Sequence, residues 1–178
     1  MSIIYNNVGV AHIYCGQVDQ AIIYLQHGLD YSRERLVQRL GLKNNMLIAK
    51  HYAYMEISER EILSFVREVF DLFGTEKFPF ITANYVANAI TIAAAKSKEL
   101  LHSILYDFPS LKVLQSALQD NQLGSGSLSA QLCVVSARYG IPELSNLRVP
   151  QYKSTLSGIR QRFIENHALN PMIFNAWL

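Results

Sequence analysis

The sequence predicts an all-α fold, an α-solenoid-like array of antiparallel helix pairs with about nine to ten helices. Apolar residues recur with the 3.6-residue period of a helix along nearly the whole chain, and no segment shows the two-residue alternation of a strand. Glycine, proline and capping residues separate these stretches at helix-length intervals. Candidate helix pairs recur every ~35–45 residues, the range of helical-pair repeats. We therefore expect a single helical-repeat domain over 1–178, either complete or a fragment of a longer chain.

The clearest repeat is expected over residues 2–41. Its first helix covers residues 2–15 and ends in a turn at Gly16. The second begins near Val18 and stops at Gly41, because glycine is a common helix C-terminal residue. The apolar stripe of this second helix is Ala21, Ile22, Leu25, Leu29, Leu36 and Leu40.

Three helices are expected in the middle of the chain. The third covers Asn45–Met55. Ser58 opens the fourth, with Glu61 completing a capping box in which each side chain binds the other residue's backbone N–H. Gly74 ends this amphipathic helix. The fifth covers Phe80–Ala95 and is apolar almost all round, as expected for a helix buried between neighbours.

The remaining helices are marked mainly by their caps. Ser97 and Ser110 are expected to cap the sixth and seventh helices. A flexible loop over 123–127 precedes the eighth, which Gly140 stops. Two further helices are then expected, one bearing Leu156, Ile159, Phe163 and Ile164 and a short last one bearing Ile173, Phe174 and Trp177.

Composition narrows the class of protein. Half of the residues are apolar, 17% are charged and the formal net charge is +2. This balance calls for neither nucleic acid nor an anionic membrane as partner. No apolar run reaches the ~18 residues of a membrane span, and we expect no signal peptide, because the first residues have a helical pattern without a basic region and apolar stretch. We expect a cytoplasmic protein in which Cys15 and Cys133 are two buried free thiols.

The segment NVGVAHIYCGQVDQAIIYLQHGL, Asn7–Leu29, carries a recognisable motif. It resembles the tetratricopeptide repeat, which has small residues where two helices cross, a turn glycine and a large apolar residue in the second helix. Small residues at a crossing let two helices approach closely. The matching positions are Gly9, Gly16, Ala21, Leu25 and Gly28.

Downstream, the resemblance rests on spacing alone. Helix pairs starting near Asn45, Phe80 and Ser127 follow at repeat-like intervals, but none carries the full set of small residues. A different helical bundle is therefore the alternative to a solenoid.

The resemblance implies that the first helix of each pair lines a concave groove that binds partners. In the first repeat, the groove positions are Ile3, Asn6, Val10, Ile13 and Tyr14. Further asparagines on expected first helices extend this set, because an amide can both donate to and accept from the main chain of a peptide. They are Asn45, Asn84 and Asn88. The arrangement resembles the peptide-sensing domains of Gram-positive quorum-sensing regulators.

These observations favour a protein- or peptide-binding module, such as the sensing domain of a bacterial transcriptional regulator. The alternatives are a stand-alone adaptor or secretion-type chaperone, and a helical enzyme or enzyme subunit whose site has no recognised motif. The five histidines show no metal-ligand spacing, and no phosphate loop is present. We expect no catalytic residue, metal or cofactor, and no direct nucleic-acid or membrane partner. The apolar start of the chain suggests either a fragment whose upstream part is missing or an end that another subunit covers, as in a homodimer.

Overall fold

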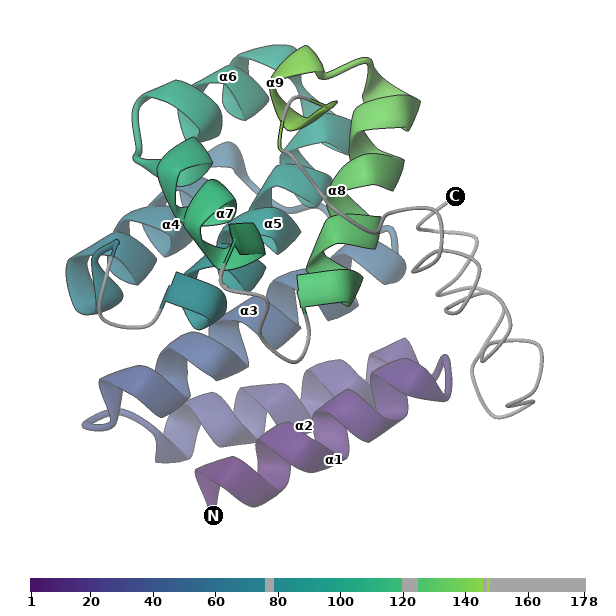
Figure 1. Cartoon of the computed structure of the whole chain (residues 1–178). Helices are drawn as coiled ribbons and strands as arrows, with labels where there is room; N and C mark the ends of the chain where they lie inside the picture. The colour runs from purple at the N-terminus through teal and green to yellow at the C-terminus, as the bar shows by residue number, and fades with distance from the viewer. Residues whose placement is uncertain (76–78, 120–124, 146, 148–178) are drawn as a thin grey trace. The chain divides into compact units, whose positions relative to one another are not determined.

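The computed structural model describes residues 1–75, 79–119, 125–145 and 147, and every regular element among them is an α-helix (Figure 1). The all-α prediction is confirmed. The solenoid arrangement stays a prediction. The helices of the described residues are α1 Ser2–Tyr14, α2 Val18–Tyr31, α3 Leu36–Tyr52, α4 Glu59–Phe73, α5 Pro79–Lys96, α6 Lys98–Tyr106, α7 Ser110–Gln119, α8 Ser125–Tyr139 and α9 Pro142–Ser145.

Contacts between residues group the described chain into two compact units. Unit 1 comprises Met1–Glu68 and unit 2 comprises residues 69–147. Helix α4 runs without a break through the boundary between them. The expectation of one domain over 1–178 therefore stays a prediction, and each unit is described by itself.

Close contact between α1 and α2 confirms the role expected for Gly9, because a Cβ at this position would lie 2.7 Å from Leu25 Cγ on α2. Gly28 lies closest to α3 instead: a Cβ there would lie 2.5 Å from Leu42 Cδ2 on α3 and 3.2 Å from Tyr5 Cβ on α1. Gly16, in the turn between the helices, has a φ of 72°, a conformation that favours glycine.

The second helix is shorter than predicted. It ends at Tyr31, and α3 already begins at Leu36, so Gly41 lies inside α3 and the first helix pair ends well before residue 41. Ser32 terminates α2, since its backbone N–H and its hydroxyl both donate to the Leu29 carbonyl, each over 3.1 Å. Leu36 is 61% exposed and does not continue the buried stripe.

The turn at residues 32–35 lets α3 fold back onto both α2 and α1. This packing buries Leu42 completely beside Gly28 and draws Met46 and Ala49 into the same core. The third helix is therefore longer than Asn45–Met55, because its first two turns bury apolar side chains as well.

Half of the capping box at the start of α4 is confirmed. The Glu61 N–H donates to Ser58 Oγ over 3.1 Å. The Glu61 carboxylate does not reach back to the cap; it pairs with Lys50 at 2.7 Å. Gly74 follows the last residue of α4 with a φ of 61°, as expected for a helix stop.

In unit 2, α5 packs against α6, α7 and α8. The prediction for Ser97 is confirmed, because its hydroxyl accepts from the Leu100 N–H. Ser110 is not a cap: it is buried, and its hydroxyl donates to the Ile104 carbonyl over 2.5 Å. Helix α8 begins at Ser125, inside the predicted loop over 123–127.

Helix α8 ends at Tyr139, and Gly140 follows with a φ of 65°, as predicted. The short helix α9 after it was not predicted. The two helices expected to bear Leu156 and Ile173 lie outside the described residues.

The thiols are more accessible than predicted. Cys15 is exposed because it directly follows α1 in the turn, and Cys133 is half-buried in α8; both are free. Among the residues that the structure describes, no helix is both long enough and apolar enough to cross a bilayer.

Candidate functional site

Helices α1 and α3 lie side by side in unit 1 and are joined by two side-chain hydrogen bonds. Ser2 Oγ donates to Gln38 Oε1 over 2.5 Å, and Asn45 Nδ2 donates to Asn6 Oδ1 over 2.9 Å. The bonded positions advance in the same direction along both helices, so α1 and α3 run parallel. Two of the predicted binding residues, Asn6 and Asn45, are thereby brought together.

The asparagines form a short directed chain. Asn44 Nδ2 donates to Asn45 Oδ1 over 3.1 Å, and Asn45 in turn donates to Asn6. Within the described part of the molecule, Asn6 Nδ2 donates to no protein acceptor. Both Asn6 and Asn45 are half-exposed, so the Asn6 end of this series of hydrogen bonds carries N–H donors that a ligand carbonyl can reach.

Apolar side chains flank this amide pair on α1. Ile3 and Tyr14 are 53% and 50% exposed, and Val10 is half-buried. These positions are seven and four residues apart and so share one side of the helix. We call the surface formed by Ile3, Asn6, Val10, Tyr14 and Asn45 the α1–α3 face.

One predicted groove residue lies elsewhere. Ile13 is only 6% exposed and packs in the core with Leu25, Leu42 and Ala49. Its position on α1 turns it toward α2 and α3, so it supports the fold and is not accessible to a partner.

The other two predicted residues belong to unit 2 and already have intramolecular partners. Asn84 Nδ2 donates to the Phe80 carbonyl one turn earlier on α5, over 2.8 Å. Asn88 Oδ1 accepts from Gln131 Nε2 on α8 over 2.9 Å. A peptide would have to compete for these groups, and a binding role for Asn84 and Asn88 stays a prediction.

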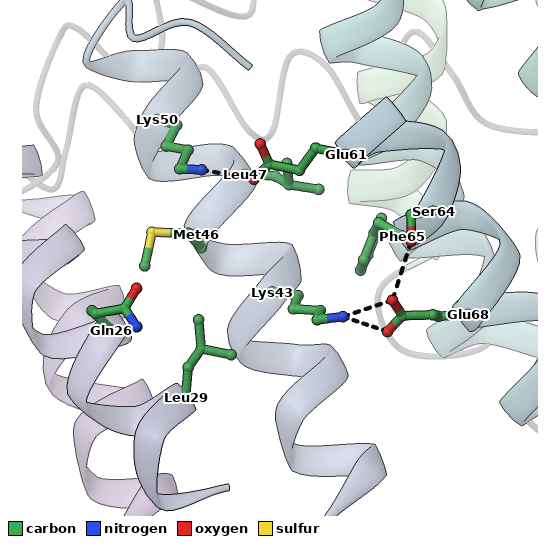
Figure 2. A pocket seen from close by; sticks show the side chains of 10 residues that line it. All are labelled: Gln26, Leu29, Lys43, Met46, Leu47, Lys50, Glu61, Ser64, Phe65 and Glu68. Carbon is green, nitrogen blue, oxygen red and sulfur yellow. Dashed lines mark hydrogen bonds and ion pairs between the residues drawn. The ribbon is translucent and has the colours of Figure 1, made fainter. Parts of the chain in front are cut away.

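A second concave feature of unit 1 was not predicted. A pocket of about 270 Å³ opens between α2, α3 and the first turns of α4 (Figure 2). Apolar side chains from all three helices form part of its wall, and the rest consists of charged side chains from α3 and α4 together with Gln26 and Ser64. The lining residues are Gln26, Leu29, Lys43, Met46, Leu47, Lys50, Glu61, Ser64, Phe65 and Glu68.

The charged groups of this pocket pair across it (Figure 2). Lys43 Nζ lies 2.6 Å from both carboxylate oxygens of Glu68, and Lys50 Nζ lies 2.7 Å from Glu61 Oε1. The two lysines are seven positions apart on α3, and the two glutamates are seven positions apart on α4. The matched spacing, in opposite order along the chain, is the signal that could have revealed α3 and α4 as an antiparallel pair.

Replacing Lys50 with methionine is expected to lower the free energy of unfolding by no more than ~1 kcal/mol, since partly exposed ion pairs contribute little. Lys50 and Glu61 are 24% and 38% exposed. A double-mutant cycle with Glu61→Gln, read by urea denaturation, measures their coupling free energy, which should shrink in high salt. Lys98→Met is the control, because Lys98 is exposed and forms no ion pair among the described residues. A coupling of several kcal/mol would contradict this view of the pair.

A few titratable side chains of unit 2 have pKa values that their surroundings shift. Burial raises the pKa of the Cys133 thiol. In unit 2, the Tyr106 hydroxyl donates to the Glu143 carboxylate, which lowers the pKa of Glu143 and raises that of Tyr106. Across the described ranges, no three His, Cys, Asp or Glu side chains are placed to hold a metal ion. The expectation that the protein is not an enzyme stays a prediction.

No protein-family model, curated protein or solved structure matches the chain with significance. The likeness to the tetratricopeptide repeat is therefore carried by the residues of the first helix pair alone.

Proposed function

We propose that the protein is a helical-repeat interaction module whose α1–α3 face binds an extended peptide or an extended segment of a partner protein. The observation that carries this proposal is the Asn6–Asn45 pair, which joins two parallel helices and leaves amide donors at a half-exposed position. In support, α3 contacts both α1 and α2, the contact pattern expected where the first helix of a second pair follows a first pair.

The chemistry of the α1–α3 face suits a main chain better than a charged group. An extended peptide offers unpaired carbonyl and N–H groups along its length, and asparagine amides can satisfy both. No Lys or Arg lies in α1, so a clamp for a terminal carboxylate is not favoured. Ile3, Val10 and Tyr14 supply apolar and amphipathic area for side chains of the peptide.

Within this class, we favour the sensing domain of a cytoplasmic bacterial regulator over an adaptor or secretion-type chaperone. A sensor should gain thermal stability when a short peptide binds, because a ligand that binds only the folded state stabilises it. A chaperone should instead require a long client segment. A helical enzyme, the third alternative, would turn over a substrate at a site that these residues do not form.

Replacing both Asn6 and Asn45 with alanine is expected to weaken peptide binding by about tenfold or more, since two hydrogen-bonding amides are lost. The probe is a set of peptides selected from a random phage-displayed library on the wild-type protein. Their dissociation constants are then measured by fluorescence anisotropy for the wild type and the double variant.

The matched control is Asn7→Ala, which removes an exposed amide from the next position of α1. It should bind the selected peptides as the wild type does. Equal affinity of the Asn6/Asn45 double variant, with its melting temperature unchanged, would overturn the assignment of the α1–α3 face. Failure of the library to yield any binding peptide would instead count against peptide binding as the function.

A further inference from the structure

Five aromatic rings of unit 1 form a continuous row along the junction of α1 and α2. Tyr5 stacks on Tyr31 with ring centroids 5.6 Å apart and lies 6.4 Å from Tyr24. Tyr24 in turn stacks on His12 at 5.1 Å, and His27 lies 5.7 Å from Tyr5. We call Tyr5, His12, Tyr24, His27 and Tyr31 the aromatic seam.

The aromatic seam lies on the side of the helix pair that α3 does not cover. On α2, the side buried against α1 and α3 is formed by Ala21, Leu25 and Gly28. The seam residues fall on other sides of the helix and are half-exposed or exposed. Beside them, Met1 and Ile4 are 71% and 60% exposed. This outer side of α1 and α2, opposite α3 in Figure 1, is therefore aromatic and apolar.

Charge is nearly absent from these two helices. Helix α1 contains no Asp, Glu, Lys or Arg, and α2 contains only Asp19 and Asp30. Helix α4, by contrast, carries six such residues over a similar length. Depletion of charge together with enrichment in tyrosine is the composition found at the centres of protein interfaces.

The size of this outer side fits a dimer interface. Helices of 13 and 14 residues, at about 1.5 Å per residue and about 10 Å across, together present roughly 400 Å² of projected surface. Because side chains protrude from the helices, the accessible area of this side is larger than its flat projection. A standard-size complex buries ~800 Å² per partner, about twice this flat projection, so the surface matches a small dimer interface.

We propose that a second copy of this chain binds here, with the aromatic seams of two molecules meeting about a two-fold axis. Two identical surfaces with so few charges meet with little electrostatic repulsion, and a two-fold arrangement places each patch against itself. A partner of strong charge gains little from this surface, since Asp19 and Asp30 are the only charged residues of the two helices. Membrane binding is disfavoured as well, because interfacial helices are typically rich in Lys and Arg.

Sedimentation equilibrium of the whole chain over a range of concentrations tests this proposal. The wild type is expected to reach twice the 20.2-kDa mass of one chain. Ile4→Arg and Tyr31→Arg should each raise the dissociation constant of the dimer at least ~100-fold, because the two-fold axis brings two like charges into one apolar interface. Circular dichroism should show wild-type helix content, since residues 4 and 31 are both about 60% exposed.

The matched control is Tyr54→Arg, the same exchange at a site that is 93% exposed and outside α1 and α2. It should dimerise as the wild type does. A wild type that stays monomeric at the highest soluble concentration would overturn the proposal. The occupant of this surface would then be a different protein or a lipid membrane. A dimer that both arginine variants preserve would overturn it too. Neither result bears on peptide binding at the α1–α3 face, which the Asn6/Asn45 variant tests separately.

Discussion

Replacing Gly9 with leucine is expected to lower the free energy of unfolding of unit 1 by about 1–3 kcal/mol or more, through overpacking. Even the first carbon of a side chain at this position would lie 2.7 Å from Leu25 Cγ and 3.4 Å from the Ala21 carbonyl oxygen. Leu25 is fully buried, so it has no solvent-filled space into which to move. The added side chain must therefore push α1 away from α2, which separates the core beneath them. Urea denaturation followed by circular dichroism measures the loss.

Asn7→Leu is the matched control for Gly9→Leu. It adds a leucine to the same helix two residues earlier, at an exposed position. Its effect should stay within about 0.5 kcal/mol, as is usual for surface substitutions. If Gly9→Leu has an effect as small as that of Asn7→Leu, then the close crossing of α1 and α2 is wrong, and the repeat resemblance loses its structural basis.

Local signals predicted the local structure well. Gly16, Gly74 and Gly140 mark turns or helix ends and have positive φ, and the Ser58 and Ser97 hydroxyls cap their helices as expected. These features depend on a few neighbouring residues, so a sequence pattern can identify them. The end of α2 depends on more than its neighbours, because an apolar stripe through Leu29, Leu36 and Leu40 also fits one long helix. The chain instead turns after Tyr31, and Leu42 of α3 packs beside Gly28 of α2. A contact between two helices is not visible in the pattern of either one.

The candidate site was predicted only in part, because most of its contacts join residues on different helices. Asn6 and Asn45 come together because they lie on α1 and α3, parallel helices separated in the chain by α2, and the repeat resemblance implied that arrangement. The sequence alone did not reveal the ion pairs of Lys43 and Lys50 with α4, because such pairing requires the register between α3 and α4. The partners of Asn84 and Asn88 were missed too, since helix periodicity does not show whether an amide already has an intramolecular acceptor or donor.

Helix α4 is the element through which the two units can influence each other's stability. The part of α4 up to Glu68 belongs to unit 1 and bears Glu61 and Glu68, which pair with α3. Its last five residues, 69–73, belong to unit 2, where Phe70 stacks on Phe108 with centroids 5.8 Å apart and Phe73 lies 6.2 Å from Tyr85. Because the helix is continuous from Glu59 to Phe73, unfolding of these last residues removes backbone hydrogen bonds from the preceding turn.

Replacing Ile90 with alanine is accordingly expected to destabilise both units. Ile90 is fully buried in α5, which packs on α6, α7 and α8, so truncation leaves a cavity and costs about 2–5 kcal/mol. Hydrogen exchange read by mass spectrometry resolves this effect segment by segment. Amides of α5 to α8 should lose protection most, and those of α4 and α3 should follow, because α4 continues from one unit into the other and its Glu61 and Glu68 pair with α3.

Ile81→Ala is the matched control, since it makes the same exchange on the same helix at a site that is 40% exposed. It should change protection only near the start of α5. The informative comparison is the protection of α1 to α3 in the Ile90→Ala variant. If those amides exchange at the wild-type rate while α5 to α8 have lost protection, then α4 does not couple the two units. The expectation of a single helical-repeat domain would then be wrong, and unit 1 alone would be the interaction module.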